Sequence, residues 1–177
     1  MPITGTSPAI VVPTTGGGSV LGAKVSLSVS NLYPVAGGPA AYVTFDTIEF
    51  DDGPWVNSGT GPDGQPPKSS MTLPAGRFLL VANIAMNGLA GTNTTYYGYA
   101  TFEIDRGGSG TTYLHPALYQ PAYLNNSGLA GSITTAIDTQ AGDILALVAF
   151  DGSGLTRYFG PECTLEAYKI GEAAVSL

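Results

Sequence analysis

The stretch SITTAIDTQAGDILALVAF, residues 132–150, decides the expected fold. It contains two runs typical of β-strands, Ser132–Ile137 and Ile144–Phe150, which are separated by a short polar turn. Within that turn, Gly142 can adopt the positive φ that a tight reversal demands, and the Asp143 side chain can bond nearby backbone amides. The stretch therefore predicts a strand, a tight turn and a second strand.

Similar strand-like runs recur along the rest of the chain, most of them with the apolar–polar alternation of half-buried strands. The further predicted strands are Val25–Val29, Tyr42–Phe45, Thr47–Phe50, Met71–Leu73, Phe78–Met86, Tyr97–Ile104, Thr111–Leu114 and Thr164–Ile170. Clusters of Gly, Asn and Asp separate them, and these residue types favour turns. About nine or ten strands in one domain indicate a sandwich or barrel, of which the jelly roll is the two-sheet form. We expect an all-β jelly-roll domain over residues 23–177.

Residues 1–22 differ from the rest of the chain and predict an extended N-terminal arm. They contain three prolines and the flexible run Gly16–Gly18, which favour an extended segment over a folded unit. The only apolar cluster in the arm is formed by Ile10, Val11 and Val12. We expect these three residues to contact another chain, and a disordered tail is the alternative.

The composition argues against nucleic acid and membranes as partners. Charged residues make up 11% of the chain, the net charge is −7, and the six Lys and Arg residues are scattered rather than clustered. A phosphate backbone needs clustered cations, and a membrane span needs about 18 or more apolar residues in succession. The sequence from Met1 to Gly5 lacks the basic start and apolar stretch of a secretory signal. We therefore expect synthesis and folding in a cytoplasm.

No catalytic residues are expected. Cys163 is the single cysteine, so an intrachain disulfide is impossible, and its apolar surroundings favour a small buried side chain. His115 is the single histidine, and no G-x-S-x-G motif marks a nucleophile that it could activate. The chain is therefore not expected to be an enzyme.

Four acidic residues close together raise the possibility of calcium binding, namely Asp46, Glu49, Asp51 and Asp52. Their spacing differs from the D-x-D-x-D-G pattern that converges several oxygens on one ion. A solvated acidic turn is the favoured interpretation, and we expect neither a metal nor a cofactor.

Tyrosines gather in the middle of the sequence, at Tyr96, Tyr97, Tyr99, Tyr113, Tyr119 and Tyr123. Tyrosine combines an apolar ring with a polar tip, which suits cores and subunit interfaces alike. Sugar binding would use the same residues on an exposed face. Packing and a subunit interface are favoured, and a glycan remains a possible partner.

Five segments resemble the C1q/tumour-necrosis-factor-like jelly-roll superfamily. They are Val43–Asp46, Met71–Phe78, Leu118–Leu124, Ile133–Ile144 and Thr164–Ile170, and they occur in the matching order. The resemblance implies a compact threefold homotrimer. In the last segment, strand alternation places Thr164, Glu166, Tyr168 and Ile170 on one side. The resemblance implies that Tyr168 and Ile170 point toward the trimer axis, and that Tyr123 approaches it from a neighbouring strand.

The predicted function follows from the trimer and the arm together. We expect a non-enzymatic virion structural protein, most simply a head decoration or cement protein of a tailed phage, made in the host cytoplasm. Its arm, through Ile10, Val11 and Val12, would contact the major capsid protein or another virion protein. The alternative is a fibre tip, or a carbohydrate-binding adhesin domain that contacts the host surface.

Overall fold

The computed structural model describes residues 20–28, 31–33, 41–59, 67–88, 96–106, 111–113, 118–122, 129–151 and 157–173. All regular elements in these ranges are β-strands, and none of the described residues belongs to a helix that could cross a membrane. The predicted contact residues Ile10, Val11, Val12 and Tyr123 lie outside the described ranges, as does all of the predicted arm before Val20.

The strands form two antiparallel sheets. Sheet A consists of β1 (Gly22–Ser26), β2 (Asn31–Tyr33), β4 (Thr47–Asp51), β6 (Gly76–Gly88), β10 (Leu129–Thr139), β12 (Arg157–Phe159) and β13 (Thr164–Gly171). Sheet B consists of β3 (Ala41–Tyr42), β5 (Ser70–Leu73), β7 (Tyr96–Asp105), β8 (Thr111–Tyr113), β9 (Leu118–Ala122) and β11 (Asp143–Asp151). In sheet A the order is β2-β12-β6-β13-β1-β4, with β10 also paired to β6. In sheet B, β11 lies beside β7, and the short strands pair with these two.

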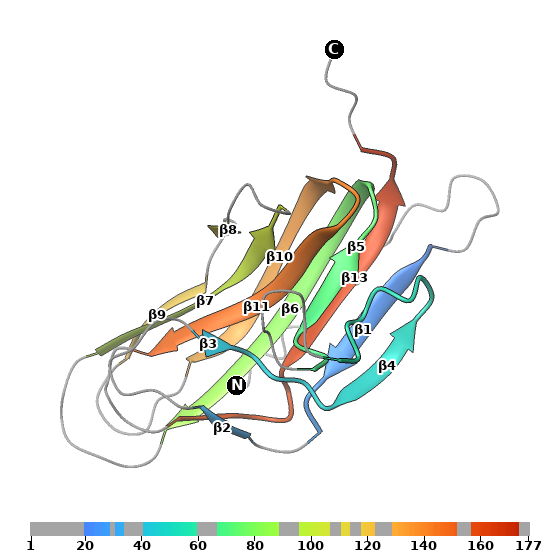
Figure 1. Cartoon of the computed structure of the whole chain (residues 1–177). Coiled ribbons are helices and arrows are strands. Elements are labelled where there is room, and N and C mark those ends of the chain that lie inside the picture. Colours follow the sequence, from blue (N-terminus) through green and yellow to red (C-terminus); the bar gives the residue numbers. More distant parts are fainter. Residues whose placement is uncertain are drawn as a thin grey trace, which may run out of the picture.

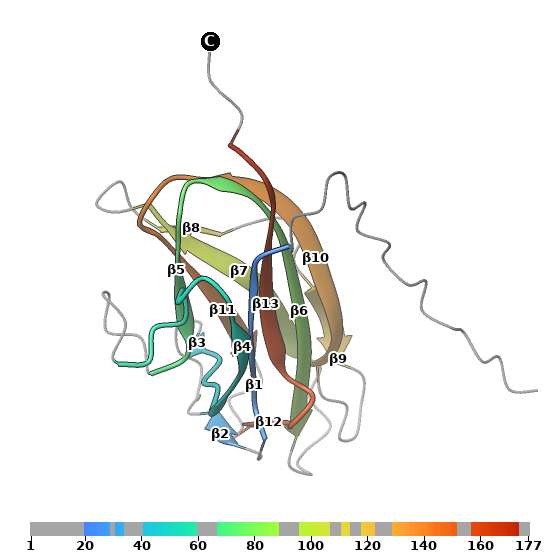
Figure 2. The same cartoon turned by 90° about the vertical axis from the view of Figure 1, so that its right-hand side faces the viewer.

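The two sheets pack face to face as a sandwich (Figure 1). Figure 2 shows the layers edge-on, with β1, β13 and β6 in one and β5 and β11 in the other. The first strand, β1, pairs with the last, β13, so that Gly22 lies opposite Tyr168. The start of β1 and the end of β13 therefore lie at the same end of the sandwich.

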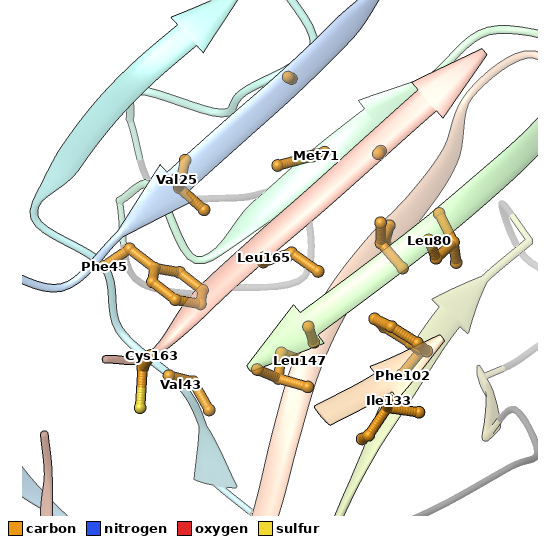
Figure 3. Packing of buried hydrophobic residues seen from close by; sticks show 14 of the residues in the cluster. Val25, Val43, Phe45, Met71, Leu80, Phe102, Ile133, Leu147, Cys163 and Leu165 are labelled. Atoms are coloured by element: carbon orange, nitrogen blue, oxygen red, sulfur yellow. The ribbon is translucent and has the colours of Figure 1, made fainter. Parts of the chain in front are cut away.

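The hydrophobic core fills the space between the sheets because successive strand residues face opposite sides. On β6, Phe78 and Leu80 are fully buried, whereas Arg77, which precedes Phe78 on the same strand, is exposed. Sheet B contributes Phe102 and Leu147, which are also fully buried. Figure 3 shows Leu80 and Leu165 from sheet A gathered with Phe102 and Leu147 from sheet B. The core is continuous from β1 to β10 across sheet A.

The predicted turn in residues 132–150 is confirmed. Gly142 has a φ of 91°, and the backbone N–H of Gln140 donates to Asp143 Oδ2 at 3.0 Å. The two flanking strands are present as β10 and β11, and each is longer than predicted. The turn residues thus act structurally, as their chemistry indicated.

Other predicted boundaries were wrong. The predicted strand Tyr42–Phe45 is a strand only at its first residue, since β3 ends at Tyr42 in sheet B and β4 begins at Thr47 in sheet A. Residues 43–46 cross between the layers, and the side chains of Val43 and Phe45 enter the core. The strands β2, β9 and β12 had not been identified as strands from alternation.

Candidate assembly interface on sheet A

Strand β13 divides its side chains between the core and the outer face of sheet A. Leu165 and Ala167 are fully buried in the core, while Glu166 and Tyr168 are only partly buried and lie on the opposite side. This division agrees with the predicted alternation. It is interrupted at the end of the strand, because the register against β6 shifts between Lys169 and Gly171. Ile170 lies at this shift and is 41% exposed.

The Tyr168 ring is the centre of an apolar strip that runs across the outer face of sheet A. Its neighbours on the flanking strands are Gly22 on β1 and Leu79 on β6, and Leu79 lies opposite Ala136 on β10. Gly22 makes room for the ring, since a Cβ at this position would lie 2.8 Å from Tyr168 Cδ1. On the side of Tyr168 away from Leu79 lies the Phe50 ring of β4, and the centroids of the Phe50 and Tyr168 rings are 6.2 Å apart. Half-buried rings in such a strip are typical of subunit interfaces.

A charged group lies directly beside the strip. The Tyr168 hydroxyl donates to Glu166 Oε2 at 2.7 Å. Lys24 Nζ lies 3.6 Å from Glu166 Oε1 and 3.4 Å from Glu49 Oε2. The side chain of Glu166 is 15% exposed, against 25% for Lys24 and 42% for Glu49. Lys24 therefore bridges a central carboxylate and a peripheral one across three adjacent strands.

Hydrogen bonds extend this group across the sheet toward β10. Ser132 Oγ donates to Asn83 Oδ1 at 2.5 Å, and Asn83 Nδ2 donates to Thr164 Oγ1 at 2.9 Å. Thr164 Oγ1 in turn donates to Glu166 Oε1 at 3.5 Å. An open depression of about 630 Å³ adjoins Asn83 and Ser132 and is bordered by Glu162. The outer face of sheet A thus carries an apolar strip and a connected polar layer side by side.

The environment shifts the pKa of two groups in this layer. Burial raises the pKa of the Tyr168 phenol above its ordinary value, and the hydrogen bond to Glu166 and the nearby negative charges raise it further. The pKa of the Glu49 carboxyl is lowered, first by a hydrogen bond from Ser26 and then by Lys24, although desolvation opposes them. Tyr168 is neutral and Glu49 is ionised at neutral pH, and the two shifts widen the pH range over which they stay so.

Each of the four acidic residues considered for calcium binds a different protein group, through a hydrogen bond or an ion pair. Asp46 accepts from Ser28 and Thr47, Asp51 from the backbone of Trp55 and Val56, and Asp52 from the backbone of Gly22, while Glu49 pairs with Lys24. Among the described residues, no three His, Cys, Asp or Glu side chains are placed to hold a metal ion. The three aspartates thus stabilise loops and strand ends, and Glu49 links β4 to β1.

Cys163 is buried, as its apolar surroundings predicted. Its Sγ accepts from the backbone N–H of Ala85 at 3.3 Å and donates to the Ala85 carbonyl at 3.3 Å. Burial raises the pKa of this thiol to about 11. Cys163 therefore connects the start of β13 to β6. The single histidine, His115, lies outside the described residues.

One of the clustered tyrosines takes part in a second aromatic group, on the face of sheet B away from the core. The rings of Tyr99 and Phe150 are stacked, with centroids 5.3 Å apart and an interplanar angle of 20°. In the same sheet, the Tyr42 hydroxyl donates to Glu103 Oε1 at 2.8 Å, and Glu103 is 5% exposed. The structure does not describe the side chains of Tyr96, Tyr97, Tyr113 and Tyr119, and Tyr123 lies outside the described ranges.

Comparisons with known proteins bear on the fold. No protein-family model matches the chain, and no curated protein sequence does. Among solved structures, Eiger TNF from S. frugiperda aligns with a TM-score of 0.60 and 13% identity, over 89% of this chain and 97% of that one. The chain has a C1q/TNF-like jelly-roll fold.

Two further structures with the C1q/TNF-like jelly-roll fold align over nearly their whole length. The globular domain of zebrafish complement 1qA aligns with a TM-score of 0.55 and 12% identity, over 86% of this chain and 98% of that one. Murine APRIL at pH 8.0 aligns with a TM-score of 0.57 and 12% identity, over 85% of this chain and 99% of that one. These likenesses show the fold alone. They confirm the architecture that the sequence resemblance implied.

Proposed function

We propose that this chain is a non-enzymatic structural protein that assembles as a homotrimer through the outer face of sheet A. The observation that carries the proposal is the apolar strip around Tyr168, which leaves its aromatic ring half-buried in a single chain. Among the described residues, the exposed large hydrophobic side chains are Leu21, Ile48 and Ile170. Leu21, which precedes β1, and Ile170, on β13, lie beside the Tyr168 strip, because the backbone N–H of Lys169 donates to the Leu21 carbonyl. Ile48 lies on the next strand, β4, opposite Val25 and farther along β1. Exposed apolar side chains that adjoin a half-buried aromatic strip mark an interaction site.

The sequence resemblance supports three copies rather than two. Threefold cyclic assembly closes on itself and leaves no free heterologous surface, which suits a particle component. The same resemblance predicts Tyr168 and Ile170 near the axis. An exposed Ile170 beside the Tyr168 strip supports that prediction. Tyr123 remains a predicted third member of this interface.

The virion is the proposed setting of the trimer. The low charge content and the Pro/Gly-rich residues 1–22 support a head decoration protein of a tailed phage, in which the arm grips the major capsid protein or another virion protein. Because β1 pairs with the end of β13, the arm joins the domain near Ile170. Three arms would then start close together, at the end of the trimer that faces the shell.

Two measurements test the proposed function. Multi-angle light scattering of the purified chain should give three chain masses at micromolar concentration. Incubation with empty capsids and with a glycan array should show binding to capsids and none to glycans. A monomer at all concentrations would contradict the trimer, and glycan binding without capsid binding would contradict the decoration role.

A second candidate function, a fibre tip or carbohydrate-binding adhesin, is favoured by the stacked Tyr99–Phe150 pair on sheet B. A trimer closed through sheet A would turn this face outward. Aromatic rings of this kind can pack against the apolar faces of sugars. Loss of glycan binding in Tyr99→Ala, with the trimer intact, would support this function.

A further inference from the structure

Lys24 occupies the one position of the proposed interface where a positive charge meets the central carboxylate. In the cross-strand row that contains it, Phe50 lies on β4, Glu166 on β13 and Val81 on β6. Thr134 completes the row on β10. Lys24 and Glu166 are thus an ion pair flanked by uncharged residues on both sides. Glu49, the second carboxylate near Lys24, is more exposed and lies toward the edge of the sheet.

Symmetry makes the charge of this row decisive. Around a threefold axis, each side chain near the axis faces the same side chain of the other copies. An unpaired Glu166 would therefore bring three like charges together in a region that excludes water, where their repulsion is strong. Paired with Lys24, and with Tyr168 and Thr164 donating hydrogen bonds to it, Glu166 enters the interface with its charge already compensated.

We propose that Lys24 is a specificity-determining residue of this interface, and that the partner it selects is a second copy of the same chain. The inference rests on the proposed trimer and deepens it. Because Lys24 and Glu166 compensate each other within each copy, two identical faces meet without unpaired Glu166 charges facing one another. The remaining negative charge of the group, on Glu49, lies toward the exposed edge of the sheet. A partner with a strongly charged face would find no free countercharge at the centre of the interface. Self-association is then favoured over mixed assembly.

The test is a rescue experiment. Lys24→Met keeps an unbranched apolar stem and removes the charge, so it leaves Glu166 uncompensated. The concentration at which half of the chains are trimeric should rise at least about tenfold in light scattering, because a buried charge has lost its partner. Adding Glu166→Gln to Lys24→Met should bring this concentration back toward the wild-type value.

Lys68→Met is the matched control, because it removes the same charge from a residue that bonds the Asp46 backbone carbonyl, away from this row. It should leave assembly unchanged. Lys24→Met with wild-type assembly, or a double variant as impaired as the single one, would overturn the inference while leaving the trimer standing. If Lys24→Met does not fold, a folded but monomeric double variant overturns it as well. A monomeric wild type would overturn the proposed function and this inference with it.

Discussion

Tyr168 combines two properties at one position, an apolar ring in the outer strip and a hydroxyl that donates to Glu166. Gly22 opposite the ring and Leu79 beside it leave the ring half-buried in a single chain. Aromatic residues at the centre of an interface contribute far more binding energy than those at its rim. The position should therefore be sensitive to charge and to removal of the hydroxyl, in ways that can be separated.

Tyr168→Asp should abolish the trimer. The change places a second carboxylate beside Glu166 and removes the ring, and loss of one such anchor costs at least about 2 kcal/mol in each copy. Light scattering at micromolar concentration should show monomer or aggregate, and Tyr123→Asp is expected to do the same. Ser58→Asp, in an exposed loop, is the control and should remain trimeric. Intact trimers for both tyrosine variants would place the axis elsewhere.

Tyr168→Phe should make stability less sensitive to alkaline pH. The pKa of the Tyr168 phenol is raised in the folded state, so the folded chain keeps a proton that an unfolded tyrosine releases near pH 10. The resulting stabilisation is fully present below about pH 10 and is lost as the pH rises toward the folded-state pKa. Urea unfolding at pH 8, 10 and 11, at one protein concentration, should show a smaller loss of free energy in Tyr168→Phe than in the wild type.

The strands show which parts of the fold alternation predicts and which it does not. Long strands such as β6 and β11 were predicted because many of their residues face the core. Strands β2 (Asn-Leu-Tyr) and β12 (Arg-Tyr-Phe) are short and lack an apolar–polar–apolar order. Strand β9 contains Pro121, which lacks a backbone donor. Their partners are far away in sequence, so only the folded chain identifies them.

The candidate interface was predicted to a similar extent. Alternation on β13 placed Glu166 and Tyr168 on one face, which is correct. The role of Lys24 was missed, because it depends on β1 lying between β13 and β4. No local pattern around residue 24 indicates that a carboxylate from each neighbouring strand will reach it. The local sequence shows only that Lys24 directly precedes the alternating run Val25–Val29. This run predicts a strand but does not indicate which strands will pair with it.

Gly142→Ala tests the turn between β10 and β11. A Cβ at this position would meet nothing within 4 Å, so its cost comes only from the φ of 91°, which non-glycine residues rarely adopt. The free energy of unfolding should fall by about 1 kcal/mol or more. Gly59→Ala also meets nothing within 4 Å, without a positive φ, and should change stability by less than about 0.5 kcal/mol. Equal effects of the two substitutions in urea unfolding would contradict this explanation.

At the scale of the whole molecule, the arm and the sandwich should be separable. β1 begins at Gly22, whose backbone N–H donates to Asp52 Oδ2, so a truncation that removes residues 1–19 leaves the sheet intact. The truncated chain should keep the melting temperature and the trimer of the full chain and lose attachment to capsids. A full-length variant with Ile10, Val11 and Val12 all replaced by serine should lose attachment too. Unchanged capsid binding by the truncated chain would show that the arm is not the anchor.

The position of β13 between β6 and β1 also has a consequence for biosynthesis. Sheet A cannot join its first strand to its middle until residues 164–171 have left the ribosome, because β13 supplies the pairing partners of both neighbours. Until then, the nascent chain exposes unpaired strand edges, which are prone to aggregation. Folding that depends on such distant pairings is slow. Efficient production of this protein should therefore depend on chaperones that protect the chain until synthesis is nearly complete.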